Sequence, residues 1–214
     1  MITPTDFDQL YRGDEDPFRV GESWYEQRKI AVTMSSLAAP RYREIWDVGC
    51  GTGHLAVALA GRCDRLLAGD SAPTACRLTA DRLAGIGHAE VEVHELPAAP
   101  TDSVGRFDLV MLSEVLYYLP PDGIDATGAM VTEITATDRT AEVMVVNWRH
   151  FPSDAHLSGL AAADRLDLLL RDLGWQSPVV HHDEDFVLRS WRRPPGTPAA
   201  DEPADNGSSV QDRR

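Results

Sequence analysis

Basic residues and cysteines are scarce in this chain, and long hydrophobic runs are missing. Lysine and arginine number 20 against 34 aspartates and glutamates, so the formal net charge is -14. Such acidity argues against a nucleic-acid partner, because phosphate contacts need a basic face. No apolar run approaches the roughly 20 residues of a membrane span, and the N-terminus lacks the regions of a signal peptide. We therefore expect a cytoplasmic protein with neither a nucleic-acid nor a membrane partner.

The cysteines and histidines predict no disulfide framework and no metal site. The three cysteines are odd in number and form no Cys-x-x-Cys pair, so we expect free thiols in a reducing compartment. The run His181-His182-Asp183 contains metal-ligand side chains, but the tip of a hairpin explains it more simply. The 214 residues suffice for one domain with a full core.

Strand-like and helix-like segments alternate along most of the chain, which predicts a parallel sheet with helices on both faces. The expected strands are 45–48, 65–69, 90–94, 107–112 and 142–148, and the expected helices are 22–37, 55–62, 73–83, 124–135 and 157–173. Two further strands, 177–181 and 186–191, are close enough to form a hairpin. The expected fold is α/β: a Rossmann-like, seven-stranded, mostly parallel sheet with helices on both faces and a C-terminal antiparallel hairpin.

The most informative segment is the turn 47–53, Asp-Val-Gly-Cys-Gly-Thr-Gly. An apolar strand runs into Gly49, Gly51 and Gly53 and then into a helix, which presents backbone N–H groups and a positive helix end to a ligand. Glycine permits the tight turn and the close approach. Asp47 before the turn disfavours a phosphate and favours a cationic amine. This combination suits S-adenosylmethionine better than a dinucleotide.

Polar side chains at the other strand ends complete a candidate site, because ligands of open α/β sheets bind at the carboxyl ends of the strands. Asp70 follows the second strand and can accept hydrogen bonds from a ribose diol. Glu95, with the N–H of Leu96, follows the third and can contact an adenine edge. Ser113 and Glu114 follow the fourth strand.

Each of these residues also has a purely structural interpretation. The glycines could form only a tight turn, Asp70 could cap the following helix, and Glu95 could serve solubility. His150, at the end of the fifth strand, could be a surface residue. The set of positions argues more strongly for a site than any one of them.

These motifs resemble those of class I S-adenosylmethionine-dependent methyltransferases over residues 40–192. The resemblance rests on Asp47-x-Gly49-x-Gly51-x-Gly53, Asp70, Glu95-Leu96-Pro97 and Phe107-Asp108-Leu109-Val110. Within that class the chain is most similar to the nodulation protein S-like N-methyltransferases. The markers of this group are Asp16-Pro17-Phe18, Ser23-Trp24-Tyr25-Glu26-x-Arg28-Lys29, Ser113-Glu114-Val115-Leu116-Tyr117-Tyr118 and Trp148-Arg149-His150.

The resemblance implies methyl transfer from S-adenosylmethionine to a small molecule, most specifically N-methylation of an amino sugar or related amine. The segment 1–39 has no place in the expected sheet, so we expect an N-terminal lid or helical segment before a methyltransferase domain (40–193). The residues 194–214 have almost nothing to bury, which predicts a disordered tail. The glycines and Ser113 would contact the cofactor, with Asp47 at its ammonium, Asp70 at its ribose and Glu95 with Leu96 at its adenine.

The lid and the acceptor side supply the remaining expected site residues. From the lid, Tyr11, Trp24 and Arg28 would face the sulfonium or the methionine carboxylate. An amine must lose a proton before it attacks, and His150 is the expected base because its ordinary pKa lies near neutrality. Glu114 would bind the substrate ammonium.

Three other functions remain open at this stage. An O-methyltransferase acting on a small hydroxylated metabolite would use the same cofactor site. An NAD-dependent oxidoreductase is disfavoured because its glycine pattern requires glycine or alanine at position 54, which is His. A non-catalytic protein that binds S-adenosylmethionine could have the same fold.

Overall fold

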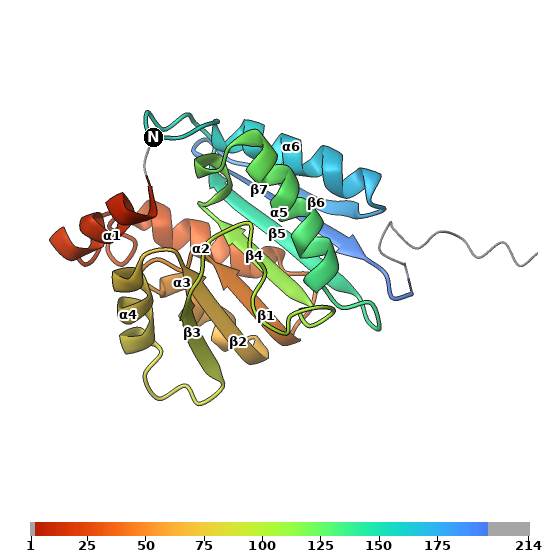
Figure 1. Ribbon diagram of the computed structural model, residues 1–214, viewed down its shortest axis with the longest axis horizontal. Coiled ribbons are helices and arrows are strands. Elements are labelled where there is room, and N and C mark those ends of the chain that lie inside the picture. Colours follow the sequence, from red (N-terminus) through yellow and green to blue (C-terminus); the bar gives the residue numbers. More distant parts are fainter. Residues whose placement is uncertain (1–2, 197–214) are drawn as a thin grey trace, which may run out of the picture.

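The computed structural model describes residues 3–196 and consists of one seven-stranded sheet covered by helices on both faces (Figure 1). The strand order is β3-β2-β1-β4-β5-β7-β6, and every pair is parallel except β5–β7 and β7–β6. The strands are β1 Tyr42–Val48, β2 Cys63–Asp70, β3 Ala89–Val93, β4 Leu109–Ser113, β5 Ala141–Trp148, β6 Gln176–His182 and β7 Phe186–Arg193. The predicted fold class is confirmed, including the terminal antiparallel hairpin. Of the tail expected from residue 194, all but the first three residues lie outside the described part.

The helices divide between the two faces of the sheet. The core under α5 (Pro121–Ile134) and α6 (Gly159–Asp172) lies on one face, and the core under α2 (Trp24–Ser36) and α3 (His54–Ala60) lies on the other. Helix α4 (Pro73–Arg82) joins the second group. Both cores contain aliphatic and aromatic side chains from β1, β2, β4 and β5, as expected for strands covered on both sides, whereas the edge strand β3 contributes to the second core alone.

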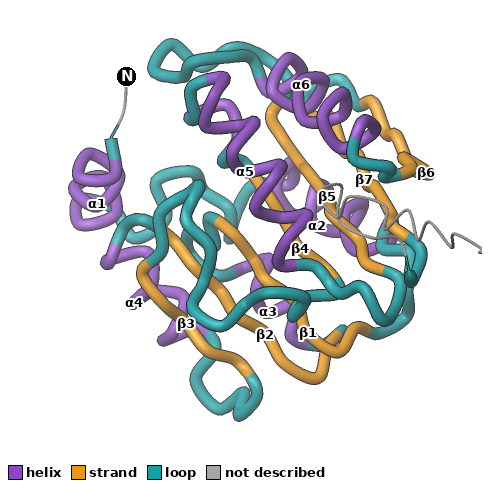
Figure 2. Tube along the Cα trace, turned by 45° about the vertical axis from the view of Figure 1, so that its right-hand side comes forward, coloured by secondary structure: helices purple, strands orange, loops and turns teal. Residues whose placement is uncertain are grey.

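Helix α1 (Pro4–Gly13) lies apart from the sheet and packs on α4 (Figure 2). No helix was predicted here, because the segment is polar and interrupted. Its signal was nonetheless present in the sequence as a capping box, in which Thr3 and Asp6 each accept a hydrogen bond from the other's backbone N–H.

The sheet changes direction between β1 and β4, since the chain winds outward to β3 on one side and to β5 on the other. A crevice at the carboxyl ends of the strands is expected at such a point. A short 3-10 helix, Leu116–Tyr118, follows β4 there. The topology therefore places the ends of β1, β2 and β4 around one opening.

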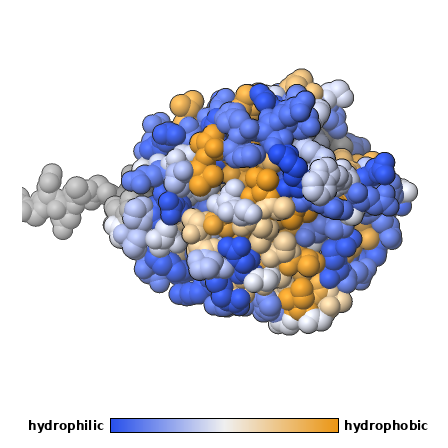
Figure 3. Space-filling view, turned by 180° about the vertical axis from the view of Figure 1, so that it is seen from behind, coloured by the Kyte–Doolittle hydropathy of each residue, from blue (hydrophilic) through white to orange (hydrophobic). Residues whose placement is uncertain are grey.

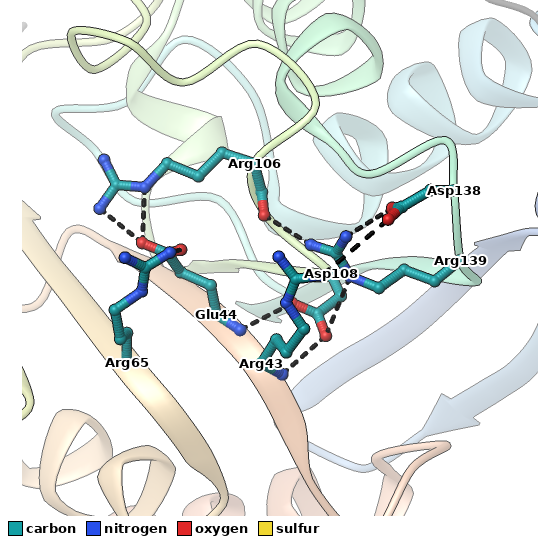
Figure 4. Close-up of polar contacts among 7 residues, drawn as sticks. All are labelled: Arg43, Glu44, Arg65, Arg106, Asp108, Asp138 and Arg139. Carbon is teal, nitrogen blue, oxygen red and sulfur yellow. Dashed lines mark hydrogen bonds and ion pairs between the residues drawn. The ribbon is translucent and has the colours of Figure 1, made fainter.

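The opposite, amino ends of the strands are tied together by a polar cluster (Figure 4). The buried carboxylate of Glu44 on β1 accepts hydrogen bonds from Arg65 on β2 and from Arg106 at 2.5 Å each. Asp108 accepts the backbone N–H groups of Arg43 and Glu44 at 2.7 Å each. These contacts join β1, β2 and the segment that enters β4, and they fix the frame on which the crevice is built.

Glu44→Gln is expected to lower the free energy of unfolding by about 2 kcal/mol, because hydrogen bonds to charged groups contribute about 1.5–3 kcal/mol. Asp64→Asn is the control, since the Asp64–Arg41 pair is more than half exposed on both sides and should contribute less than about 1 kcal/mol. Urea unfolding measures both. Equal losses in the two variants would contradict a structural role for the Glu44 cluster.

Candidate functional site

A cavity of about 850 Å³ opens at the carboxyl ends of β1, β2 and β4. This volume lies within the range of small-molecule sites. Its walls come from the glycine turn after β1, the ends of β2, β4 and β5, the loop after β3, and helices α1 and α2. Segments far apart in the sequence therefore meet in one chamber.

Hydrogen bonds from the end of β2 hold the glycine turn. The N–H groups of Gly49 and Cys50 donate to the carbonyl of Gly69 at 2.8 and 3.0 Å, and the N–H of Gly51 donates to Asp70 Oδ2 at 3.0 Å. Gly49 has a φ of +70°, and a Cβ there would lie 2.0 Å from a methyl carbon of Val115. Glycine is thus required at Gly49 both by backbone conformation and by space.

Gly53 has a different role from the one predicted. It lies outside the cavity lining that the described residues form, and it caps the start of α3 with a φ of +79°. A Cβ at Gly53 would lie 2.9 Å from the hydroxyl and 3.0 Å from the Cα of Thr79. The third glycine therefore allows α3 to approach α4, whereas Gly49 and Gly51 line the cavity as predicted.

Asp47 carries the strongest sign of a missing ligand. Its side chain is 1% exposed and lines the cavity, and neither carboxylate oxygen has a hydrogen-bond partner within residues 3–196. Burial, with a further contribution from the charge of Asp70, raises the pKa of Asp47 to about 7. A buried carboxylate without a partner is costly, and a cation in the cavity would remove that cost.

Asp70 is fixed by backbone donors at the end of β2. Oδ2 accepts from Gly51 at 3.0 Å and Oδ1 accepts from the N–H of Ala72 at 2.9 Å. Burial raises the pKa of Asp70, although these backbone N–H groups act in the opposite direction. Each carboxylate oxygen accepts more than one hydrogen bond, so the oriented side chain can still receive a diol.

Four more predicted residues line the cavity: Tyr11, Glu95, Leu96 and Ser113. Tyr11 belongs to α1, which is held in place because Asp8 accepts a hydrogen bond from the N–H of Thr74 at 2.8 Å. The Tyr11 hydroxyl would lie 3.1 Å from a Cβ at Gly51, so it reaches the glycine turn itself. The adenine contacts assigned to Glu95 and Leu96 remain predictions.

Trp24 and Arg28 do not face the cavity, contrary to the prediction. Trp24 is 75% exposed, and both residues line a separate shallow groove on the outer side of α2. Arg28 forms an ion pair with Asp183 at 2.5 Å and lies over the ring of Phe186. The face of the molecule opposite to that of Figure 1 is mainly hydrophilic with smaller hydrophobic areas (Figure 3).

The helical phase of α2 explains this correction. Residues 24 and 28 lie four apart and share the outer face of the helix. The inner face contains residue 25 and the residues one, four, five and eight positions after it. The inner residues that line the cavity are Tyr25, Glu26, Lys29, Ile30 and Thr33. They were not predicted as site residues, although the helical period of 3.6 residues could have separated the two faces.

His150 also lies outside the lining that the described residues form. Its side chain is 48% exposed, and Nε2 lies 3.5 Å from Asp185 Oδ1. Its neighbour Trp148, the last residue of β5, does reach the cavity. The chain leaves the sheet directly after Trp148, so a strand-end position did not place His150 at the site, and its expected role as base lacks structural support.

Glu114 lies in the cavity as predicted, at the centre of a buried polar cluster. Its Oε1 pairs with Lys29 Nζ at 2.5 Å, and its Oε2 accepts from the Tyr117 hydroxyl at 2.6 Å and from the N–H of Trp148 at 2.8 Å. Lys29 also pairs with Glu26 at 3.0 Å. Burial alone would lower the pKa of Lys29, but the two carboxylates outweigh it and raise the pKa. The cluster therefore contains two anions and one cation.

The cavity as a whole is negative. Among the described residues, its lining includes one lysine and no arginine. The acidic lining residues are Glu26, Asp47, Asp70, Glu95, Glu114 and Asp154. Aromatic side chains accompany them on the side of the Glu114 cluster. This lining favours positively charged or amine-bearing ligands and disfavours phosphates.

Comparisons with known proteins agree with this arrangement. A family model described as Nodulation protein S (NodS) matches residues 3–146. The chain is 32% identical to Nodulation protein S of Sinorhizobium fredii over 106 residues, 49% of this chain and 48% of the relative. The chain spans about half the length of the curated nodulation proteins it matches. It is also 30% identical to magnesium-protoporphyrin O-methyltransferase of Rhodobacter capsulatus over 182 residues, 78% of this chain and 79% of that protein.

Among solved structures, the N-methyltransferase NodS of Bradyrhizobium japonicum in complex with S-adenosyl-L-homocysteine has a similar fold. The TM-score is 0.72 at 19% sequence identity, and the match covers 88% of this chain and 98% of that one. A likeness at this level of identity shows the fold alone.

Asp47→Asn should change how stability depends on pH. Because the pKa of Asp47 is raised to about 7 in the folded protein from an ordinary value of about 4, the folded state binds more protons than the unfolded chain between these values. The free energy of unfolding of the parent therefore falls as the pH rises through this window, by up to roughly 4 kcal/mol for this group.

The Asn variant lacks this titration, so it should gain stability relative to the parent when urea unfolding is repeated at about pH 8 instead of about pH 5. Comparing the two pH values cancels the constant effect of the amide. A difference between parent and variant that is independent of pH would show that Asp47 is not buried as an unpaired carboxylate.

Proposed function

The chain belongs to the nodulation protein S family, and from this premise we propose that it is an S-adenosylmethionine-dependent methyltransferase acting on a small amine. The observation that carries the proposal is the buried carboxylate of Asp47 beside the glycine turn, which has no hydrogen-bond partner among residues 3–196. An α-ammonium group is the complement that this carboxylate lacks. When bound, S-adenosylmethionine supplies a methyl group on a positively charged sulfur, and the protein's task is to hold acceptor and donor in line.

The described residues fit the parts of this molecule. Asp47 would bind the ammonium, and the free lone pairs of Asp70 would accept the ribose hydroxyls. Gly49 and Gly51 line the cavity, so their backbone would lie against the ligand. Glu95 and Leu96 would lie at the adenine. The cationic sulfur would then lie in a cavity lined with carboxylates, which suits its charge.

The acceptor would occupy the side of the cavity around Glu114. Carboxylates outnumber the single lysine in this cavity, and an ammonium group is attracted to aromatic ring faces as well as to carboxylates. The aromatic lining residues on this side are Tyr25, Tyr117, Tyr118 and Trp148. This chemistry supports an amine, and within the amines we propose an amino sugar, in keeping with the family.

Within the segment 1–39, helices α1 and α2 would serve as a lid over both ligands. Asp8 fixes α1 to α4, Tyr11 extends to the glycine turn, and the inner face of α2 forms a wall of the chamber. A lid would exclude water and strengthen the electrostatic contacts inside. The buried free cysteines are compatible with a reducing cytoplasm, where we place the reaction.

An O-methyltransferase is the second candidate, because the chain is similar to magnesium-protoporphyrin O-methyltransferase over most of its length. The cofactor side of the cavity would serve either reaction. The negative lining at the acceptor side favours the amine, since an ammonium gains charge attraction as well as hydrogen bonds from the carboxylates around Glu114, whereas a neutral hydroxyl gains hydrogen bonds alone.

Methyl transfer from labelled S-adenosylmethionine to D-glucosamine and a panel of simple primary amines tests the proposal, with N-acetyl-D-glucosamine as the matched control. The two sugars have the same hydroxyl groups and differ only at the amine, which is acetylated in the control. We expect label in the amines and none in the acetylated sugar. Equal labelling of both sugars would indicate O-methylation. Binding of the donor without labelling of any acceptor would favour a non-catalytic protein.

A further inference from the structure

An amine acceptor must become neutral before it attacks, and the structure contains a proton acceptor for this step that is not His150. This inference rests on the proposed methyltransferase function. Within the described cavity lining, the carboxylates on the acceptor side are Glu26, Glu114 and Asp154. These carboxylates differ in the hydrogen-bond donors that contact them and therefore in their capacity to accept a proton.

Glu114 is poorly suited to take up a proton. Its two oxygens already receive donors from Lys29, from the Tyr117 hydroxyl and from the N–H of Trp148. Three donors stabilise the charged form of a carboxylate. Protonation of Glu114 would weaken these bonds and would leave the buried Lys29 with fewer counter-charges. Glu114 is therefore an anchor whose oxygens are already engaged by donors.

Glu26 has the opposite environment. Its side chain is 14% exposed on the inner face of α2, and its one hydrogen bond within residues 3–196 comes from Lys29 Nζ at 3.0 Å. Lone pairs on both oxygens are left over for a ligand. Burial raises the pKa of Glu26 against the opposing effect of Lys29, and the charges of Glu114 and Asp16 raise it further.

Asp154 is the remaining carboxylate on this side. It lies in the segment between β5 and α6, near Tyr118, and outside the cluster that Lys29 organises. Lys29 instead holds Glu26 and Glu114 close to each other, next to the turn that follows β4. An ammonium that contacts Glu114 therefore lies beside Glu26.

We propose that Glu26 is a catalytic residue that accepts a proton from the acceptor ammonium. An N–H bond of the ammonium breaks, and the proton forms an O–H bond with the Glu26 carboxylate. The freed nitrogen lone pair forms the new C–N bond with the methyl carbon, as the C–S bond breaks and its electron pair remains on sulfur. The products are the methylated ammonium, a neutral thioether and protonated Glu26, which returns its proton to water when the lid opens.

Glu26→Gln tests the proposal against the exposed control Glu22→Gln, whose side chain is 75% exposed beside Arg19. The assay uses the amine labelled in the panel above, across a pH series. We expect kcat to fall by at least about 100-fold in Glu26→Gln, as is typical for loss of a general base. The residual rate should rise with pH as free amine becomes available. Glu26→Asp should recover part of the rate, and Glu22→Gln should match the parent.

Calorimetry with S-adenosyl-L-homocysteine separates this proposal from the proposed function. The nucleoside should bind to the parent and to Glu26→Gln with the same affinity within about threefold, because Glu26 belongs to the acceptor side. If Glu26→Gln keeps the parental kcat and pH profile, or if Asp154→Asn shows the loss in its place, the Glu26 proposal is wrong and the methyltransferase function stands. If no amine is methylated, both the amine function and this proposal fail.

Discussion

The attachment of the glycine turn to the end of β2 is the constraint on which the site depends. Backbone N–H groups of the turn donate to the Gly69 carbonyl and to Asp70, so two adjacent strands fix one loop. The turn can follow this path only because Gly49 has no side chain to meet Val115. The same geometry leaves Asp47 buried beside the loop, with no hydrogen-bond partner in the described part of the chain. Backbone geometry thus determines where the negative charge of the site lies.

The carboxylates at the two ends of the sheet differ in how many hydrogen bonds they accept. At the amino ends, Glu44 and Asp108 are saturated by arginines and backbone donors and hold the strands together. At the carboxyl ends, Asp70 and Glu114 are also held by several donors. Asp47, in contrast, lacks any donor within the described residues, and Glu26 receives only Lys29. Saturated carboxylates contribute to the stability of the fold, whereas unsaturated ones reduce it and leave capacity for a ligand. This contrast locates function more directly than the shape of the cavity does.

Much of this arrangement could be predicted from the sequence, because it follows from strand ends and glycines. The order of segments gave the sheet and its final hairpin, and the positions of Asp70 and Glu95 after their strands brought them to the cavity. The side chains of α2 could not be placed from motif position alone, since helical phase decides that Glu26 and Lys29 face inward and Arg28 outward. The expected position of His150 at the cavity was wrong for a related reason. The direction of the chain after a strand depends on tertiary contacts that no local sequence pattern encodes.

The most direct test of the account is calorimetry of S-adenosylmethionine binding at about pH 7 in two buffers of different ionisation enthalpy, for the parent and for Asp47→Asn. Because the pKa of Asp47 is about 7, about half of the free protein carries a proton there, and an ammonium ligand should expel it. We expect release of about half a proton per site in the parent, and about half a proton less in the variant. Binding with the same proton balance in both proteins, or no binding to the parent, would contradict it.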